Sequence, residues 1–215
     1  MSVVIVNMTG NRCGFEDRLC AELELTVTVE TQSRSARGVG AFQGALALPV
    51  DCRVLVVVAH AGQRPDKSVR IHMGIQPPCE FAESLADDCR EASCPDEHCT
   101  HAKAVRMIES PMVLSDMISA NSPYVLVFYS CEALAPDTMA STFRNPHCLG
   151  IVGSPCKPSD LDVERVAKIV DDLDAAVASG VADGKELRRI VQHAVNSTAG
   201  DVSFCFSETM RVTEE

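Results

Sequence analysis

Two apolar stretches decide the fold: Val54-Leu55-Val56-Val57-Val58-Ala59, followed by His60-Ala61-Gly62, and Tyr124-Val125-Leu126-Val127-Phe128-Tyr129-Ser130, followed by Cys131-Glu132. Each is apolar over a length typical of a strand buried on both faces, as the strands of parallel sheets are. Functional groups collect at the carboxyl ends of such strands. If the two strands are neighbours, we therefore expect an imidazole and a thiol to meet at one edge of the sheet.

Shorter patterns continue on both sides of these strands. We predict further strands at residues 3–7, 25–29, 69–73, 147–152 and 202–206, and helices at about 15–23, 36–48, 112–120, 160–179 and 184–196. The first apolar stretch is expected to end in a tight turn at Gly62, and residues 132–146 are expected to be irregular. Strands that alternate with helices indicate an α/β fold with a mostly parallel central sheet and helices on both faces.

The chain of 215 residues is long enough for one large domain, which we expect to cover residues 1–215. An insert at about 77–104 contains four cysteines and two histidines but has no apolar period. The formal net charge of −11 disfavours nucleic acids and anionic membranes as partners, because both need a basic surface. We therefore predict a protein with neither kind of partner.

Cysteine usage and the start of the sequence bear on location. There is no basic leader followed by an apolar segment, so we expect a cytoplasmic protein. The eleven cysteines are scattered through predicted strands and helices, and most are then expected to be reduced thiols. One of them is a candidate nucleophile.

The candidate chemistry is that of a Cys–His dyad. A thiol with an ordinary pKa of about 8.5 is mostly protonated at neutral pH, so a nucleophilic cysteine needs a partner that takes its proton. We expect His60 to be that partner for Cys131. The backbone N–H groups of Ala61, Gly62 and Cys131 are candidate donors to the oxyanion of the reaction. This chemistry needs neither a cofactor nor a metal ion, and we predict none.

An apolar strand ending in a His–Gly type turn, followed several dozen residues later by an apolar strand ending in Ser-Cys, resembles the caspase-like (clan CD) cysteine peptidases. The CHAT domain family is the branch that the chain resembles most, and it is similar also over residues 113–118, 148–155 and 163–196. The family's His-Gly pair is here His60-Ala61-Gly62.

The resemblance covers about residues 3–196 and implies a caspase-like three-layer sandwich. It also implies an endopeptidase that cleaves a protein partner, with Cys131 as nucleophile and His60 as general base and acid. A regulatory or sensor protein is a further expected partner. Three acidic residues near the dyad in sequence, Asp116, Glu132 and Asp137, are candidates to line the substrate pocket.

Two alternatives stay open. The first is a catalytically inactive caspase-like interaction module. The second is a zinc-stabilised binding protein, because five potential zinc ligands are clustered in the second half of the insert, and four are enough for a tetrahedral site. They are Cys89, Cys94, His98, Cys99 and His101.

Overall fold

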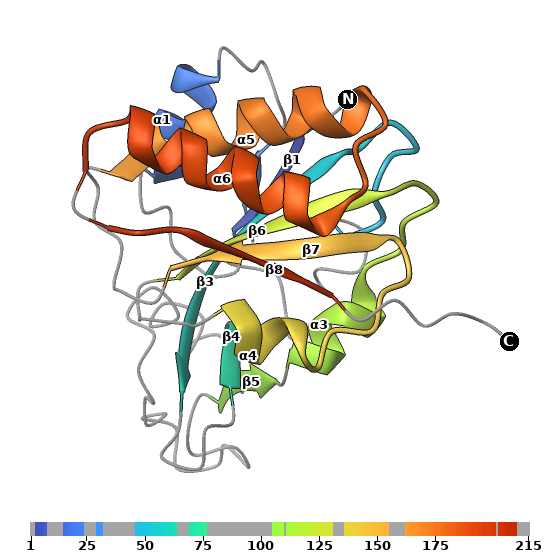
Figure 1. Ribbon diagram of the computed structural model, residues 1–215. Helices are drawn as coiled ribbons and strands as arrows, with labels where there is room; N and C mark the ends of the chain where they lie inside the picture. Colours follow the sequence, from blue (N-terminus) through green and yellow to red (C-terminus); the bar gives the residue numbers. More distant parts are fainter. Residues whose placement is uncertain are drawn as a thin grey trace, which may run out of the picture.

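The computed structural model describes residues 3–7, 15–23, 29–31, 46–63, 69–76, 105–109, 111–130, 136–154, 162–200 and 202–209. The strands are β1 (Val3–Asn7), β2 (Val29–Thr31), β3 (Val54–Gln63), β4 (Val69–Gln76), β5 (Val105–Glu109), β6 (Tyr124–Ser130), β7 (Cys148–Gly153) and β8 (Cys205–Glu208). The helices are α1 (Phe15–Glu22), α3 (Pro111–Met117), α4 (Pro136–Ala140), α5 (Val163–Ala178) and α6 (Gly184–Ser197). Together they form an α/β fold, as the sequence predicts (Figure 1).

The central sheet is mostly parallel. Its strand order is β2-β1-β3-β6-β7-β8, and the first five of these strands are parallel to one another. Only β8 runs antiparallel, beside β7. All seven residues of β6 and all six of β7 are buried. Burial on both faces explains why these strands are continuously apolar in sequence instead of alternating.

Helices pack on both faces of this sheet (Figure 1). Leu19 of α1 and the buried residues of α5 and α6 share one apolar cluster with Val56 and Val58 of β3. On the other face, Leu55 and Val57 share a cluster with buried residues of α3 and α4. We call these two sides the α5 face and the α4 face. Successive residues of β3 alternate between the two faces, as the pleat of a strand requires.

A small antiparallel ribbon extends from the sheet. Strand β3 continues beyond Ala59, and its residues His60 to Gln63 pair with β4, which pairs in turn with β5. The prediction that the chain turns tightly at Gly62 is therefore wrong, because the backbone stays extended to Gln63. Strand β4 confirms the predicted strand at 69–73 and is longer, whereas β5 was not predicted.

The two long helices agree with prediction, and their ends have local causes. Gly180 follows α5 with a φ of 83°, a left-handed conformation that glycine adopts at the least cost. Helix α6 begins after Asp183, whose carboxylate accepts a hydrogen bond of 3.1 Å from the N–H of Glu186. Helix α5 has no side-chain cap at Asp162, and the predicted cap Ser159 lies outside the described residues.

Three other predictions were displaced or wrong. Residues 46–48, the described end of the predicted helix 36–48, are not helical, and Ala47 forms a bridge with Ser119. Strand β8 begins at Cys205, three residues later than predicted. Strand β2 contains Val29, the last residue of the strand predicted at 25–29, whose other residues lie outside the described ones. Helix α4 lies in the segment expected to be irregular. The insert at 77–104 is outside the described residues.

Candidate active site

The carboxyl edge of β3 and β6 is where the sequence predicts a site. The two strands are parallel neighbours, and their register pairs Val58 with Tyr129 and Ala59 with Ser130. All four residues are buried. Ser130 is only 3% exposed, although its side chain carries a hydroxyl group. The expectation that the two apolar stretches are adjacent strands is therefore confirmed, and their last residues, Ala59 and Ser130, lie at the same level of the sheet.

His60 follows Ala59 directly, at the point where β3 leaves the parallel sheet. Its register partner is His72 of β4, and the next residue along, Ala61, is opposite Ile71. Gly62 is opposite Arg70. Ala61 and Gly62 are thus part of the ribbon and not of a turn, while their role as oxyanion donors stays a prediction.

Cys131 and Glu132 lie outside the described residues. The strand that leads to them is described up to Ser130, and the chain is described again from Pro136, the first residue of α4. The roles of Cys131 as nucleophile and of Glu132 in substrate binding therefore stay predictions. The same holds for the proposed zinc ligands of the insert, which are also outside the described residues.

Asp116 lies on the exposed side of α3, near the end of that helix. The carbonyl oxygen of Ile118, two residues later, accepts a hydrogen bond of 2.8 Å from the side-chain amide of Asn145. Asn145 comes shortly before the first residue of β7, which is at the amino edge of the sheet. The structure thus places Asp116 toward the amino edge and does not bring it together with the ends of β3 and β6.

Asp137 lies in the first turn of α4. Its carboxylate accepts a hydrogen bond from the hydroxyl of Ser207 in β8. Ser207 is opposite Ile151 of β7, so the contact lies beside the middle of the sheet and not at its carboxyl edge. This carboxylate already joins α4 to β8, and its predicted role in substrate binding is not tested.

The described thiols differ sharply in their surroundings. Burial raises the pKa of the Cys52 thiol to about 11 and that of the Cys148 thiol to about 12. Each sulfur also lies near a backbone carbonyl oxygen, that of Val54 for Cys52 and that of Gly150 for Cys148. Cys205 is exposed. Because a nucleophile must be accessible and ionised, Cys52 and Cys148 are unsuited to that role.

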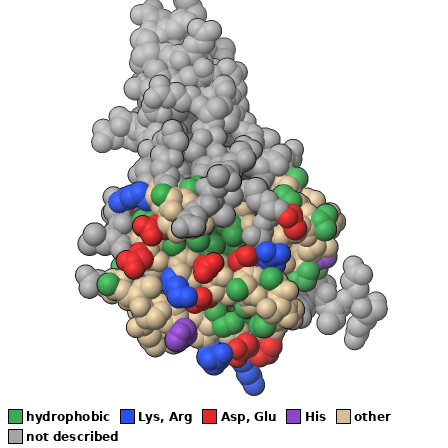
Figure 2. Space-filling model, turned by 90° about the horizontal axis from the view of Figure 1, so that it is seen from above, with side chains coloured by type: hydrophobic (Ala, Val, Ile, Leu, Met, Phe, Trp, Pro, Cys, Tyr) green, Lys and Arg blue, Asp and Glu red, His purple; other side chains and the backbone are tan. Residues whose placement is uncertain are grey.

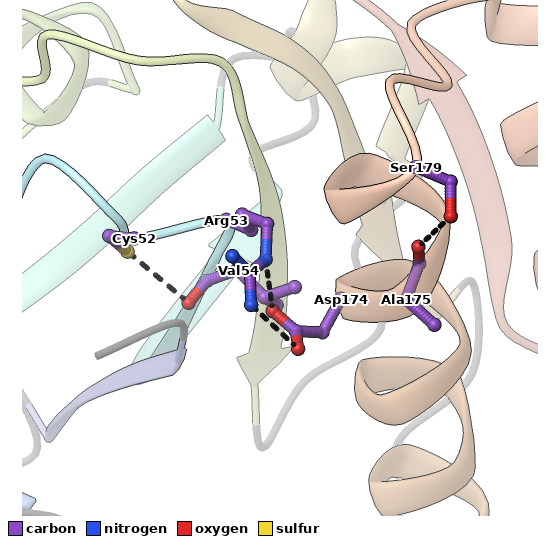
Figure 3. A network of polar contacts seen from close by, with 6 residues as sticks. All are labelled: Cys52, Arg53, Val54, Asp174, Ala175 and Ser179. Atoms are coloured by element: carbon purple, nitrogen blue, oxygen red, sulfur yellow. Dashed lines mark hydrogen bonds and ion pairs between the residues drawn. The ribbon is translucent and has the colours of Figure 1, made fainter.

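A cleft of about 290 Å³ lies at the opposite, amino edge of the sheet. It is lined mainly by apolar residues, among them Val50, Pro123 and Val181. Beside it the guanidinium of Arg53 donates hydrogen bonds of 2.8 and 3.2 Å to the two carboxylate oxygens of Asp174 on α5 (Figure 3). This ion pair joins the start of β3 to α5, on the side of the sheet away from the candidate dyad.

We found no family model, curated protein or solved structure that matches this chain. Within the described ranges, no helix is long and apolar enough to cross a membrane.

The face over α5 and α6 carries acidic and basic side chains close together (Figure 2). Among the described side chains, no group of three His, Cys, Asp or Glu could hold a metal ion.

His72 is the residue at this edge that the sequence analysis missed. The signal was present, because the alternating stretch at 69–73 was predicted to be a strand. Counting outward from the connection between Gln63 and Val69 places His72 opposite His60, which is the observed register. The pairing of His72 with His60 was not predicted because the sequence does not indicate that β3 continues beyond Ala59.

Proposed function

We propose that the protein is a caspase-like cysteine endopeptidase of the CHAT type, with Cys131 as nucleophile and His60 as general base and acid. The observation that carries the proposal is the pairing of Ala59 with Ser130, the last pair of the parallel ladder between β3 and β6. The residues that follow these two in the sequence are His60 and Cys131. A mostly parallel sheet with helices on both faces supports a caspase-like three-layer sandwich as the fold.

The alternation of side chains along the two strands also supports the proposal. Val58 and Tyr129 both belong to the apolar cluster on the α5 face. His60 comes two residues after Val58, and Cys131 comes two residues after Tyr129. Because a strand returns to the same face every second residue, the proposal assigns both members of the dyad to the α5 face. If either His60 or Cys131 came one residue earlier or later in its strand, the two residues would have been assigned to opposite faces.

The proposed reaction follows from thiol and imidazole chemistry. His60 takes the proton of the Cys131 thiol, and the thiolate sulfur attacks the carbonyl carbon of the scissile peptide bond. The imidazolium then gives its proton to the leaving amine as the C–N bond breaks, which leaves a thioester on Cys131. Water that loses a proton to His60 hydrolyses the thioester and restores the thiol. Backbone N–H groups near the ends of β3 and β6 would stabilise the oxyanion.

The substrate in this proposal is a protein in the cytoplasm, and cleavage is controlled by a regulatory or sensor protein. Which residue precedes the cut is left open, because Asp116 lies toward the amino edge and Asp137 is bonded to Ser207. A substrate-profiling library therefore has to precede the choice of a peptide probe.

The test is labelling by a thiol-directed covalent peptide probe, followed by mapping of the modified residue. We expect the probe to label Cys131, and we expect Cys131→Ala and His60→Ala to lose labelling and cleavage while keeping the wild-type melting temperature. Cys205→Ala and His193→Ala are the matched controls, because both residues are exposed and neither belongs to β3 or β6. Labelling of the Cys131→Ala variant at the wild-type rate would contradict the proposal.

A further inference from the structure

The cleft at the amino edge of the sheet has walls from three separate parts of the chain. Val50 belongs to the segment that leads into β3, Pro123 immediately precedes β6, and Val181 follows the end of α5. The volume of about 290 Å³ is at the lower end of the range of ligand pockets, which suits a single long side chain. Val50 is 69% exposed, so an occupant that covers it gains apolar burial.

Arg53 is the basic residue among the described residues that line this cleft, and its charge is already matched. The guanidinium donates hydrogen bonds to both carboxylate oxygens of Asp174 (Figure 3). Asp51, which also lines the cleft, is exposed. The formal charges of Asp51, Arg53 and Asp174 sum to −1, so the cleft does not offer an uncompensated arginine to an anion.

The end of α5 makes the same cleft more negative. This helix of 16 residues ends at Ala178, which lines the cleft, and has no basic residue in its last turn. The carboxyl end of a helix carries a partial charge of about −0.5, and a cation beside it is stabilised. The net charge of −11 over the whole chain acts in the same direction. The cleft therefore combines apolar walls with a preference for positive charge.

We propose that this cleft binds a lysine side chain in an extended basic segment of a partner protein. A lysine buries its aliphatic stem along apolar surface while its charged head stays in water. Here the stem would pack on Val50, Pro123 and Val181, and the ammonium group would lie beside Asp51 and the carboxyl end of α5. The bonds of Arg53 to Asp174 hold that guanidinium away from the ammonium group.

This docking site is separate from the candidate dyad. Six residues of β3 lie between Arg53 at the cleft and His60, so the two sites are about 20 Å apart along the strand. A partner held at the cleft would leave the carboxyl edge of the sheet open. The docking site does not rest on the proposed function, because a chain without peptidase activity would still bind the basic segment.

The test is titration of the isotope-labelled full chain with three acetylated and amidated pentapeptides, followed by NMR chemical shifts. The peptides have lysine, norleucine or glutamate between flanking alanines, and norleucine keeps the stem of lysine without its charge. Asp51→Asn removes the charge at the cleft, and Val50→Ser removes apolar wall. Met112→Ser is the matched control, because Met112 is also a large apolar residue that is 50% exposed but belongs to α3.

We expect the lysine peptide to shift the amide signals of Val50 and Val181 and to bind at least about fivefold more tightly than the glutamate peptide. Asp51→Asn should weaken the lysine peptide about fivefold and leave the norleucine peptide unchanged. Val50→Ser should weaken both of these peptides about fourfold, and Met112→Ser should weaken neither.

Equal affinities for the lysine and glutamate peptides would overturn the proposal. So would wild-type affinity for the lysine peptide in both Asp51→Asn and Val50→Ser, or no shift at Val50 and Val181 with any peptide. Sedimentation of the wild type and of Val50→Ser tests the other occupant. A wild-type dimer that Val50→Ser dissociates would assign the cleft to a second copy of the chain and likewise overturn the proposal.

Discussion

At the scale of single residues, burial separates inert thiols from accessible ones. Cys52 is 1% exposed and Cys148 is fully buried, whereas Cys205 lies on the outer side of β8. Desolvation penalises the thiolate, so both buried groups keep their protons well above neutral pH. Their role is to fill the apolar cluster on the α4 face, to which both belong.

We therefore predict that iodoacetamide at about pH 8 modifies Cys205 in the folded protein and leaves Cys52 and Cys148 unmodified until urea unfolds the chain. Mass spectrometry of the digested protein measures this directly. The neutral thiols favour the folded state fully below their ordinary pKa, and this contribution is lost as the pH rises toward about 11 for Cys52 and about 12 for Cys148. Equal native labelling of Cys148 and Cys205 would refute the burial argument.

At the scale of elements, burial decides what the sequence could predict. Strand β6 was predicted to the residue because a strand covered on both faces is apolar from end to end. The end of β3 was missed because His60-Ala61-Gly62 has no apolar run, and a glycine there indicates a turn. The backbone remains extended because β4 supplies a partner, which no pattern within β3 reveals.

Helix α4 was missed for a related reason. It has only five residues, too few to be stable by propensity alone. Tertiary contacts hold it instead: Pro136, Met139 and Ala140 are buried, and Asp137 accepts the hydrogen bond from Ser207. For the candidate site, the sequence could predict the adjacency of β3 and β6 but not the partner of His60, because that partner depends on a strand outside the parallel sheet.

The pairing of β7 with β8 gives a prediction at this scale. A Cβ atom added to Gly150 would lie 2.7 Å from the carbonyl oxygen of Ser207 and against the ring of Phe206. Because backbone cannot move aside cheaply, we expect Gly150→Ala to lower the free energy of unfolding by about 1–3 kcal/mol. Urea denaturation measures the change.

The matched control for that variant is Ser203→Ala, which removes an exposed hydroxyl group just before β8 and should change the free energy of unfolding by less than about 0.5 kcal/mol. If Gly150→Ala unfolds at the same urea concentration as the wild type, the backbone of β8 does not lie as close to Gly150 as the structure indicates.

At the scale of the whole molecule, Arg165 joins segments that are far apart in sequence. It lies near the start of α5 and is 5% exposed. Its guanidinium donates to the carbonyl oxygens of Thr198, Gly200 and Val202, which form the connection from α6 to β8. At Gly200 a Cβ atom would lie 3.0 Å from the Cζ of Arg165, so the connection passes directly over the guanidinium.

We expect Arg165→Lys to lower the free energy of unfolding by about 1–3 kcal/mol. A lysine cannot reproduce the planar fork of donors, and the buried carbonyl of Val202 left without a partner costs about 1–3 kcal/mol. Arg188→Ala on the exposed side of α6 is the control and should stay within about 0.5 kcal/mol of the wild type. Thermal and urea unfolding of both variants provide the comparison, and equal stability of the two would refute this role of Arg165.

Strand β3 belongs to both the parallel sheet and the antiparallel ribbon, since it pairs with parallel strands up to Ala59 and with an antiparallel strand from His60 onward. One continuous backbone thus transmits any change of twist in the ribbon to the residue at the junction. Substitutions in β5, which pairs with β4, can for this reason alter the backbone at this junction without touching the central core. The ribbon is accordingly the part of the molecule through which the candidate site can be tuned while the fold is left intact.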